Sequence, residues 1–249
     1  MKDMLRRLAV KLIALAKGIF FLLRPGAYLG FLATPLIFCG NSLKLSRWIF
    51  EQRKKKTAFD DFFRLSRNYE RRFELHEHVL KTEDLAAEKI DYLEFGVAGG
   101  ASLSWWLKAN ANPQSRFFGF DTFEGLPEDW GLFKKGEMAP GILTIQDDRC
   151  SLIKGLFQAT VSKFLESPRF DPTTRKVLHM DADLFSSTLL VLVMFAGYLK
   201  KGDILIFDEF CVPNHEFLAF DIFTRMHNVR YEMLGAVNNY LQVGLKITA

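Results

Sequence analysis

Cysteine is scarce in this 249-residue chain, and its three cysteines lack the spacing of a metal site. Cys39, Cys150 and Cys211 lie far apart, so we expect neither a disulfide framework nor a zinc site. Internal repeats and low-complexity tracts are also lacking, and hydrophobic residues make up 49% of the chain. This composition provides a large core and excludes global disorder. The sequence therefore indicates a folded protein in a reducing compartment.

Acidic residues are scarce at the N-terminus. Residues 1–56 contain 12 Lys or Arg residues and two acids, whereas residues 57–249 contain 21 bases and 27 acids. A nucleic-acid enzyme usually carries its positive charge on the domain that does the work, so we expect no nucleic-acid partner. Basic residues placed among apolar ones indicate instead an anionic membrane surface.

The N-terminal residues 4–43 are expected to hold the protein on the cytoplasmic face of a membrane, as a peripheral or monotopic protein. At about 100° per residue, the bases of residues 4–24 share one side of a helix that Pro25-Gly26 should end. Residues 25–43 carry no charge and are about long enough to span a bilayer. Pro35 and three glycines nevertheless favour a re-entrant hairpin. The alternative is a dimer interface or a cap over a substrate pocket, and a homo-oligomer is possible.

Three regions follow one another along the chain: an apolar basic extension (1–56), a helical linker or cap (57–89) and a domain of alternating strands and helices (90–249). Seven strands are expected, at 90–95, 116–121, 150–155, 176–181, 203–208, 229–234 and 240–248. Strands that alternate with helices predict an α/β fold with a doubly wound, mostly parallel seven-stranded sheet. Only the last two strands, joined through Asn238-Asn239, should form an antiparallel hairpin. An N-terminal helical extension precedes this domain.

Carboxylates stand at the ends of the clearest strands. They are Glu94, Asp121, the pair Asp181 and Asp183, and the pair Asp208 and Glu209. Ligands of a parallel sheet bind outside the carboxyl ends of its strands. A single acid there is as easily a helix cap, but four strand ends with acids favour a binding site.

The turn after the first strand indicates the class of cofactor. Glu94 occupies the place of the first glycine of a dinucleotide fingerprint, and Gly96 and Gly100 follow it. An acid would repel a pyrophosphate but suits a ligand with an ammonium group. Asp121, at the end of the second strand, can accept hydrogen bonds from both ribose hydroxyls. Together they favour S-adenosylmethionine.

Five blocks resemble, in order, those of the macrocin O-methyltransferase (TylF/MycF-like) family: LEFGVAGGAS, FGFDTFEGLPEDW, LIKGLFQAT, HMDADLFSSTL and GDILIFDEF. The resemblance covers about residues 90–249 and not the first 56 residues. It implies a class I methyltransferase that uses S-adenosylmethionine and Mg²⁺ to methylate sugar hydroxyls of natural products.

The resemblance also implies roles for single residues. Contacts to the cofactor fall on Glu94, Gly96, Gly100, Ser102, Asp121 and Thr122, with the adenine near Asp147 and Asp148. The metal ligands fall on Asp181, Asp208 and Glu209, and the general base on Asp183. His215 is a rival base. Phe185 and Glu209 stand where the family usually has Tyr and Asp, and the longer arm of Glu209 makes its metal ligation the least secure assignment.

The chemistry is consistent with these roles. A sugar hydroxyl is a poor nucleophile near neutral pH, so a hard divalent ion on carboxylates would lower its pKa and a further carboxylate would take its proton. Two other functions stay open. One is a catechol-type methyltransferase of small phenols. The other is a non-catalytic, membrane-tethered binding protein on a methyltransferase scaffold, which the changes at Phe185 and Glu209 permit.

Three further expectations concern single histidines and one loop. His76 and His78 lie in a charged helical pattern and should be solvated. His179 lies within a strand and should be a hydrogen-bonded core residue. The segment 130–141, which is rich in Gly and Pro, could form a mobile lid over the substrate.

Overall fold

The structure is a computed structural model, and it describes residues 1–55, 59–125, 132–137, 139, 143 and 145–249. The chain divides into two compact units, Met1–Leu43 and Lys44–Ala249.

The first unit is helical. Helix α1 (Lys2–Leu23) ends just before Pro25, as predicted, because Arg24 adopts a left-handed conformation with φ of 48°. It is followed by α2 (Pro25–Leu29), the short η1 (Gly30–Leu32) and the start of α3 (Ala33–Lys54). Neither α1 nor α2 has a buried residue.

The re-entrant hairpin expected for residues 25–43 is absent from the structure, because residues 25–54 are helical throughout. Pro35 lies in the first turn of α3, where a missing N–H group breaks no helical hydrogen bond. By length and composition alone, Pro25–Lys54 is the one helix among the described residues that could cross a membrane.

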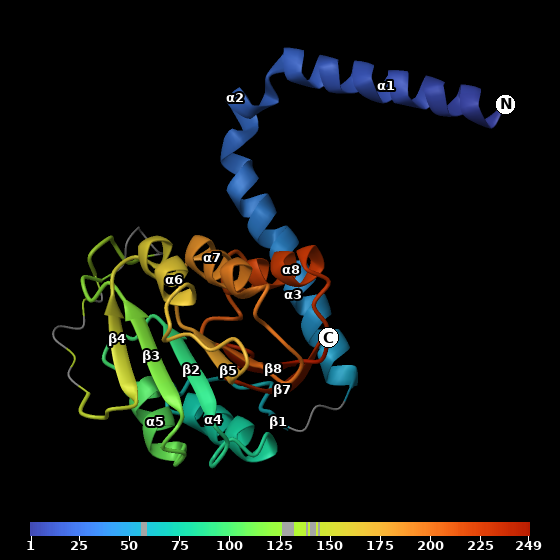
Figure 1. The fold of residues 1–249 in the computed structure, drawn as a ribbon. Helices are drawn as coiled ribbons and strands as arrows, with labels where there is room; N and C mark the ends of the chain where they lie inside the picture. The colour runs from blue at the N-terminus through green and yellow to red at the C-terminus, as the bar shows by residue number, and fades with distance from the viewer. Residues whose placement is uncertain (56–58, 126–131, 138, 140–142, 144) are drawn as a thin grey trace. The chain divides into compact units, whose positions relative to one another are not determined.

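The second unit is built on a single eight-stranded sheet (Figure 1). Its strands are β1 (Phe59–Asp60), β2 (Ile90–Phe95), β3 (Arg116–Asp121), β4 (Cys150–Lys154), β5 (Arg175–Met180), β6 (Ile204–Phe207), β7 (Tyr231–Val237) and β8 (Gln242–Ile247). They are ordered β1-β7-β8-β6-β5-β2-β3-β4. Strand β8 runs antiparallel to β6 and β7, and every other pair is parallel. The predicted fold class, with its antiparallel C-terminal pair, is confirmed.

The sheet has one strand more than predicted. Strand β1 pairs with Gly235 and Ala236 of β7, inside the segment that we expected to be helical. Gly235 makes room for it, since a Cβ atom added there would lie 3.1 Å from the Phe59 ring. A two-residue strand that depends on a glycine more than 170 positions away leaves no local periodicity to read.

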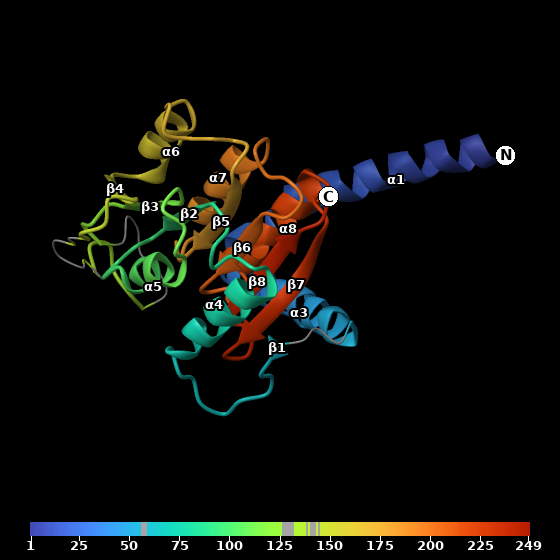
Figure 2. The ribbon, with the colours of Figure 1, turned by 60° about the horizontal axis from the view of Figure 1, so that its bottom comes forward.

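Helices cover both faces of the sheet (Figures 1 and 2). Helices α4 (Arg71–Thr82) and α5 (Ala101–Ala109) pack on one face, and α6 (Phe157–Leu165), α7 (Phe185–Phe195) and α8 (Glu216–Met226) pack on the other. Strand β2 is buried throughout, and its side chains alternate between the two layers: Tyr92 packs with α4 and α5, whereas Leu93 belongs to the opposite core. The buried strands of the predicted sheet are thus explained by the double layer.

The last part of α3 belongs to this second unit. Leu45 is buried in its core, and the ring of Trp48 lies 4.8 Å from that of Phe210. The indole of Trp48 also donates a hydrogen bond of 2.8 Å to the hydroxyl of Tyr231. The sheet therefore packs against residues of the extension that precede Thr57.

In a parallel sheet, a crevice for ligands forms at the point where the strand order reverses. Strand β2 pairs with β3 on one side and with β5 on the other, which makes this the switch point of the fold. Gly96, just after β2, has φ of 95°, and a Cβ atom there would lie 1.9 Å from the Asp181 carbonyl oxygen. Only glycine allows this approach, which brings the turn after β2 against the end of β5.

We expect Gly96→Ala to lower the free energy of unfolding by about 2–4 kcal/mol, since the added methyl group meets rigid backbone at a left-handed position. Gly99→Ala is the matched control, because nothing lies within 4 Å of a Cβ atom at Gly99. Urea unfolding of the two variants measures the difference. Equal free energies would contradict the close approach.

Candidate functional site

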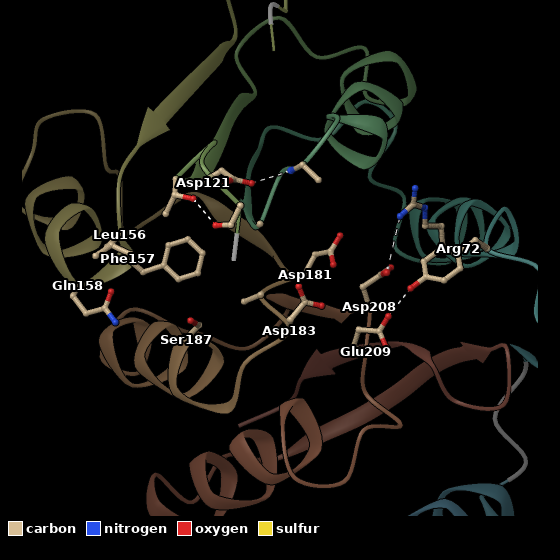
Figure 3. A pocket seen from close by; sticks show the side chains of 16 residues that line it. Arg72, Asp121, Leu156, Phe157, Gln158, Asp181, Asp183, Ser187, Asp208 and Glu209 are labelled. Carbon is tan, nitrogen blue, oxygen red and sulfur yellow. Dashed lines mark hydrogen bonds and ion pairs between the residues drawn. The ribbon is translucent and has the colours of Figure 1, made fainter. Parts of the chain in front are cut away.

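One pocket lies at the carboxyl ends of β2, β3, β5 and β6, the edge at which the acids were predicted to gather (Figure 3). One side of it is formed by the turns after β2 and β3 and by the start of α6: Gly96, Ala98, Asp121, Thr122, Gly125, Leu156, Phe157 and Gln158. The other side is mostly polar: Tyr69, Arg72, Asp181, Ala182, Asp183, Ser187, Asp208 and Glu209.

Asp121 organises the glycine-containing turn. Its Oδ2 accepts hydrogen bonds from the backbone N–H groups of Val97 (2.8 Å) and Ala98 (2.9 Å). Its Oδ1 accepts one of 2.7 Å from the N–H group of Phe123. Each carboxylate oxygen can accept more than one hydrogen bond, so Asp121 can still bind ribose hydroxyls. Gly96, Asp121 and Thr122 are thus brought together at the pocket, as the cofactor prediction requires.

Four other residues assigned to the cofactor do not line this pocket. Glu94 is buried, and its Oε2 accepts a hydrogen bond of 2.6 Å from the Tyr92 hydroxyl. Gly100 begins α5 with φ of 74°, and Ser102 is buried in the first turn of that helix. Asp148 is exposed. Their contacts with a cofactor stay predictions.

Four acids directly follow β5 and β6. They lie close together because the two strands are paired as far as their last residues, Met180 and Phe207. Asp181, Asp183, Asp208 and Glu209 all line the pocket. Burial, and then repulsion from Asp208 and Asp183, raises the pKa of Asp181 well above its usual value. Burial, and then the charges of Glu209 and Asp208, raises the pKa of Asp183 to about 7. A base with a pKa near 7 is suited to proton transfer at neutral pH.

The acid side has the chemistry of a cation site. Carboxylate oxygens are the ligands that Mg²⁺ prefers, and the Oδ1 atom of Asp208 is buried without a hydrogen-bond partner. Within the described residues, however, no group of three or more His, Cys, Asp or Glu side chains is arranged so that it could hold a metal ion. Asp208 Oδ2 lies 4.0 Å from Arg72 Nη1, and Glu209 accepts a hydrogen bond of 2.5 Å from the Tyr69 hydroxyl (Figure 3).

The described lining residues of the pocket include no histidine. His215 is not a lining residue, and its Nδ1 accepts a hydrogen bond of 3.3 Å from the N–H group of Phe185. His179 is a buried, hydrogen-bonded core residue as predicted, with Nδ1 2.7 Å from the Tyr92 hydroxyl. The prediction for His76 is wrong: it is fully buried, and burial lowers its pKa. His78, also expected in solvent, is half-buried and stacks on Phe59.

Two groups of lining residues were not predicted. Leu156, Phe157 and Gln158 follow β4, and the block LIKGLFQAT at the carboxyl end of a strand was the signal that could have indicated them. Tyr69 and Arg72 come from the segment between β1 and β2 and have no local signal. Five residues of the expected lid (130, 131, 138, 140 and 141) lie outside the described residues, so the lid stays a prediction.

The chain resembles known methyltransferases. Residues 93–210 match the family described as "Methyltransferase domain". A search of the curated proteins finds no match.

Solved structures share the fold. CalS11, described as "Calicheamicin Methyltransferase", is 22% identical with a TM-score of 0.57, over 72% of this chain and 80% of that one. The apo structure of CalS11, "TDP-rhamnose 3'-o-methyltransferase", is 23% identical with a TM-score of 0.52, over 72% and 81%. The O-methyltransferase NovP is 18% identical with a TM-score of 0.53, over 73% and 79%. These likenesses show that the second unit has the class I methyltransferase fold.

The raised pKa of Asp183 predicts a pH-dependent stability. A carboxyl group whose pKa is higher in the folded state binds more protons there, so its contribution to stability is greatest at low pH and is lost as pH rises from about 4 to about 7. In EDTA, Asp183→Asn should raise the melting temperature at pH 8 by about 5 °C and change it little at pH 4. Melting curves over this range test it, and an equal shift at both pH values would contradict it.

Proposed function

We propose that this protein is an S-adenosylmethionine-dependent, divalent-cation-assisted O-methyltransferase that acts on a sugar or polyol hydroxyl. The observation that carries the proposal is one pocket with two sides, a glycine-containing turn fixed by Asp121 and a cluster of four acids. The first side suits an adenosine ligand, and the second suits a hard cation and a base.

The similar proteins support this proposal in two respects. The methyltransferase domain supports transfer of a methyl group. The names of CalS11 and NovP, one a TDP-rhamnose 3'-O-methyltransferase and the other an O-methyltransferase, support a hydroxyl acceptor and, for CalS11, one on a sugar. The macrocin O-methyltransferase resemblance agrees with both and stays a prediction.

Each side of the pocket has its own task in the proposed reaction. When bound, S-adenosylmethionine supplies a methyl group on a sulfonium, and a divalent cation lowers the pKa of the acceptor hydroxyl. Asp121 binds the ribose, and Gly96 allows the ligand to approach the backbone. Asp181 and Asp208 would hold the cation, and Glu209 would join them after leaving its hydrogen bond with Tyr69. Asp183 takes the hydroxyl proton as the new C–O bond forms and the methyl–sulfur bond breaks.

Calorimetric titration with S-adenosylmethionine, together with turnover assays on sugars and catechols, tests the proposal. Asp181→Ala or Asp208→Ala should abolish Mg²⁺-dependent turnover and leave the affinity for S-adenosylmethionine within about twofold, because the cofactor lies on the other side of the pocket. Asp183→Asn should keep the affinity for a divalent cation, measured with Mn²⁺. It should reduce turnover by about 10²–10⁴-fold.

Three outcomes would count against it. If the protein does not bind S-adenosylmethionine at millimolar concentration, it is not an S-adenosylmethionine-dependent enzyme. Turnover that persists in EDTA, or in the Asp181→Ala variant, would exclude the proposed role of a divalent cation. Turnover of catechols alone would favour the small-phenol alternative, and cofactor binding without turnover on any acceptor would favour the non-catalytic one.

We also infer that residues 4–43 attach the protein to a membrane. The apolar side chains of α1 are exposed, among them Leu5, Leu8, Leu12 and Ile19, and its bases share the opposite side of the helix. Residues 25–43 are uncharged and mostly exposed. Exposed apolar helices with a basic stripe match the interior and the anionic surface of a bilayer.

Flotation with vesicles tests the attachment. The full chain should float with vesicles that contain phosphatidylserine, and a chain starting at Lys44 should not. The shorter chain starts at Lys44 because Leu45 and Trp48 pack in the core of the second unit. A full-length variant with Arg6, Arg7, Lys11 and Lys17 changed to Gln should float at least tenfold less, since each base near the surface contributes about 1 kcal/mol. Equal flotation of all three proteins would exclude the attachment.

A further inference from the structure

The acid side of the pocket contains one guanidinium, that of Arg72 in the first turn of α4. Among the described lining residues it is the only Lys or Arg. Its side chain is only 18% exposed, so the charge is largely removed from water. A charged side chain buried to this extent is normally paired and hydrogen-bonded.

Arg72 is poorly paired within the protein. Its Nε atom is buried without a hydrogen-bond partner, and its Nη1 atom lies 4.0 Å from Asp208 Oδ2, beyond hydrogen-bond reach. The nearby Glu209 already accepts a hydrogen bond from Tyr69. A guanidinium has five N–H donors, and buried donors without acceptors are costly. The Nε donor of Arg72 therefore lacks an acceptor, and the Nη1 group has only a long ion pair at the wall of the pocket.

Another arginine of the same protein shows how a structural ion pair is built. Arg116 binds Asp91 with two hydrogen bonds, from Nε to Oδ1 at 2.9 Å and from Nη2 to Oδ2 at 2.5 Å. Arg72 makes no comparable bidentate contact with Asp208. Its arrangement is thus unlike that of an arginine whose only task is to neutralise a neighbouring acid.

Aromatic contacts and the preceding backbone nevertheless position the Arg72 side chain. The guanidinium carbon lies 5.1 Å from the centre of the Phe73 ring and 5.6 Å from that of the Tyr69 ring, within cation–π distance. The segment that leads into α4 is fixed at the β7–β8 turn, where Asn68 and Asn238 exchange hydrogen bonds of 3.1 and 3.0 Å. A planar, positioned fork of this kind matches the oxygens of a phosphate or carboxylate.

We propose that Arg72 binds an anionic group, a phosphate or a carboxylate, carried by the acceptor. The proposal rests on the proposed function and narrows its substrate class to anionic sugars such as sugar phosphates and uronic acids. A divalent cation on the acids would offset two of their negative charges, which would leave the guanidinium for the acceptor.

The test is calorimetric titration of the S-adenosylhomocysteine and Mg²⁺ complex with three probes. Glucose 1-phosphate carries a phosphate, glucuronate carries a carboxylate, and methyl glucoside is neutral. At least one anionic probe should bind tenfold or more tightly than the neutral one, and the stronger of the two identifies the anion. Arg72→Gln should remove this preference, and Arg72→Lys should keep part of it, because lysine retains the charge without the fork.

Arg67→Gln is the matched control, since Arg67 is on the same segment, 3.9 Å from Cys211 Sγ, and does not line the pocket. It should keep the full preference.

Melting temperature and S-adenosylhomocysteine affinity are measured for every variant, and Arg72→Lys provides the comparison if Arg72→Gln does not fold. Equal binding of charged and neutral probes to the wild type, no binding of either anionic probe, or an undiminished preference in the Arg72 variants would overturn the inference. A wild type that does not bind S-adenosylhomocysteine would overturn the proposed function instead.

Discussion

The close contact between the turn after β2 and the end of β5 is the constraint on which the site depends. A Cβ atom at Gly96 would lie 1.9 Å from the Asp181 carbonyl oxygen, so the two segments meet backbone to backbone. The contact lies at the switch point of the sheet, where β2 pairs with β3 and with β5. It places the turn held by Asp121 directly beside the acids that follow β5. A looser contact would separate the two sides of the pocket and with them the proposed methyl donor and acceptor.

The acid cluster is the part of the molecule that opposes folding most clearly. Burial and mutual repulsion raise the pKa values of Asp181, Asp183 and Glu209, so the folded protein disfavours their charged forms. Tyr69 and Arg72 offset this only in part, since Asp208 Oδ1 has no hydrogen-bond partner. A sheet needs no such cluster for its stability. Strongly perturbed acids gathered in a pocket are typical of functional sites, and here they sit where a cation and an exchangeable proton are proposed.

Residues 59–70 are held against the last two strands of the sheet. Strand β1 pairs with β7, and the asparagines of the β7–β8 turn bond to the backbone that leads into α4. The acceptor side of the pocket is therefore shaped by residues from before and after the sheet core.

The sequence by itself determined the fold class, the antiparallel C-terminal pair and the edge at which the acids gather. It could do so because strand ends and periodicity are local, and parallel strands bring their carboxyl ends to one edge. Tertiary structure alone decided what local patterns do not encode. Strand β1 forms because Gly235 leaves space for Phe59, and His76 is buried because α4 packs beside Trp105, Trp106 and His179. Tyr69 and Arg72 reach the acids only through contacts between segments more than a hundred residues apart, and the packing of the folded chain sets their positions.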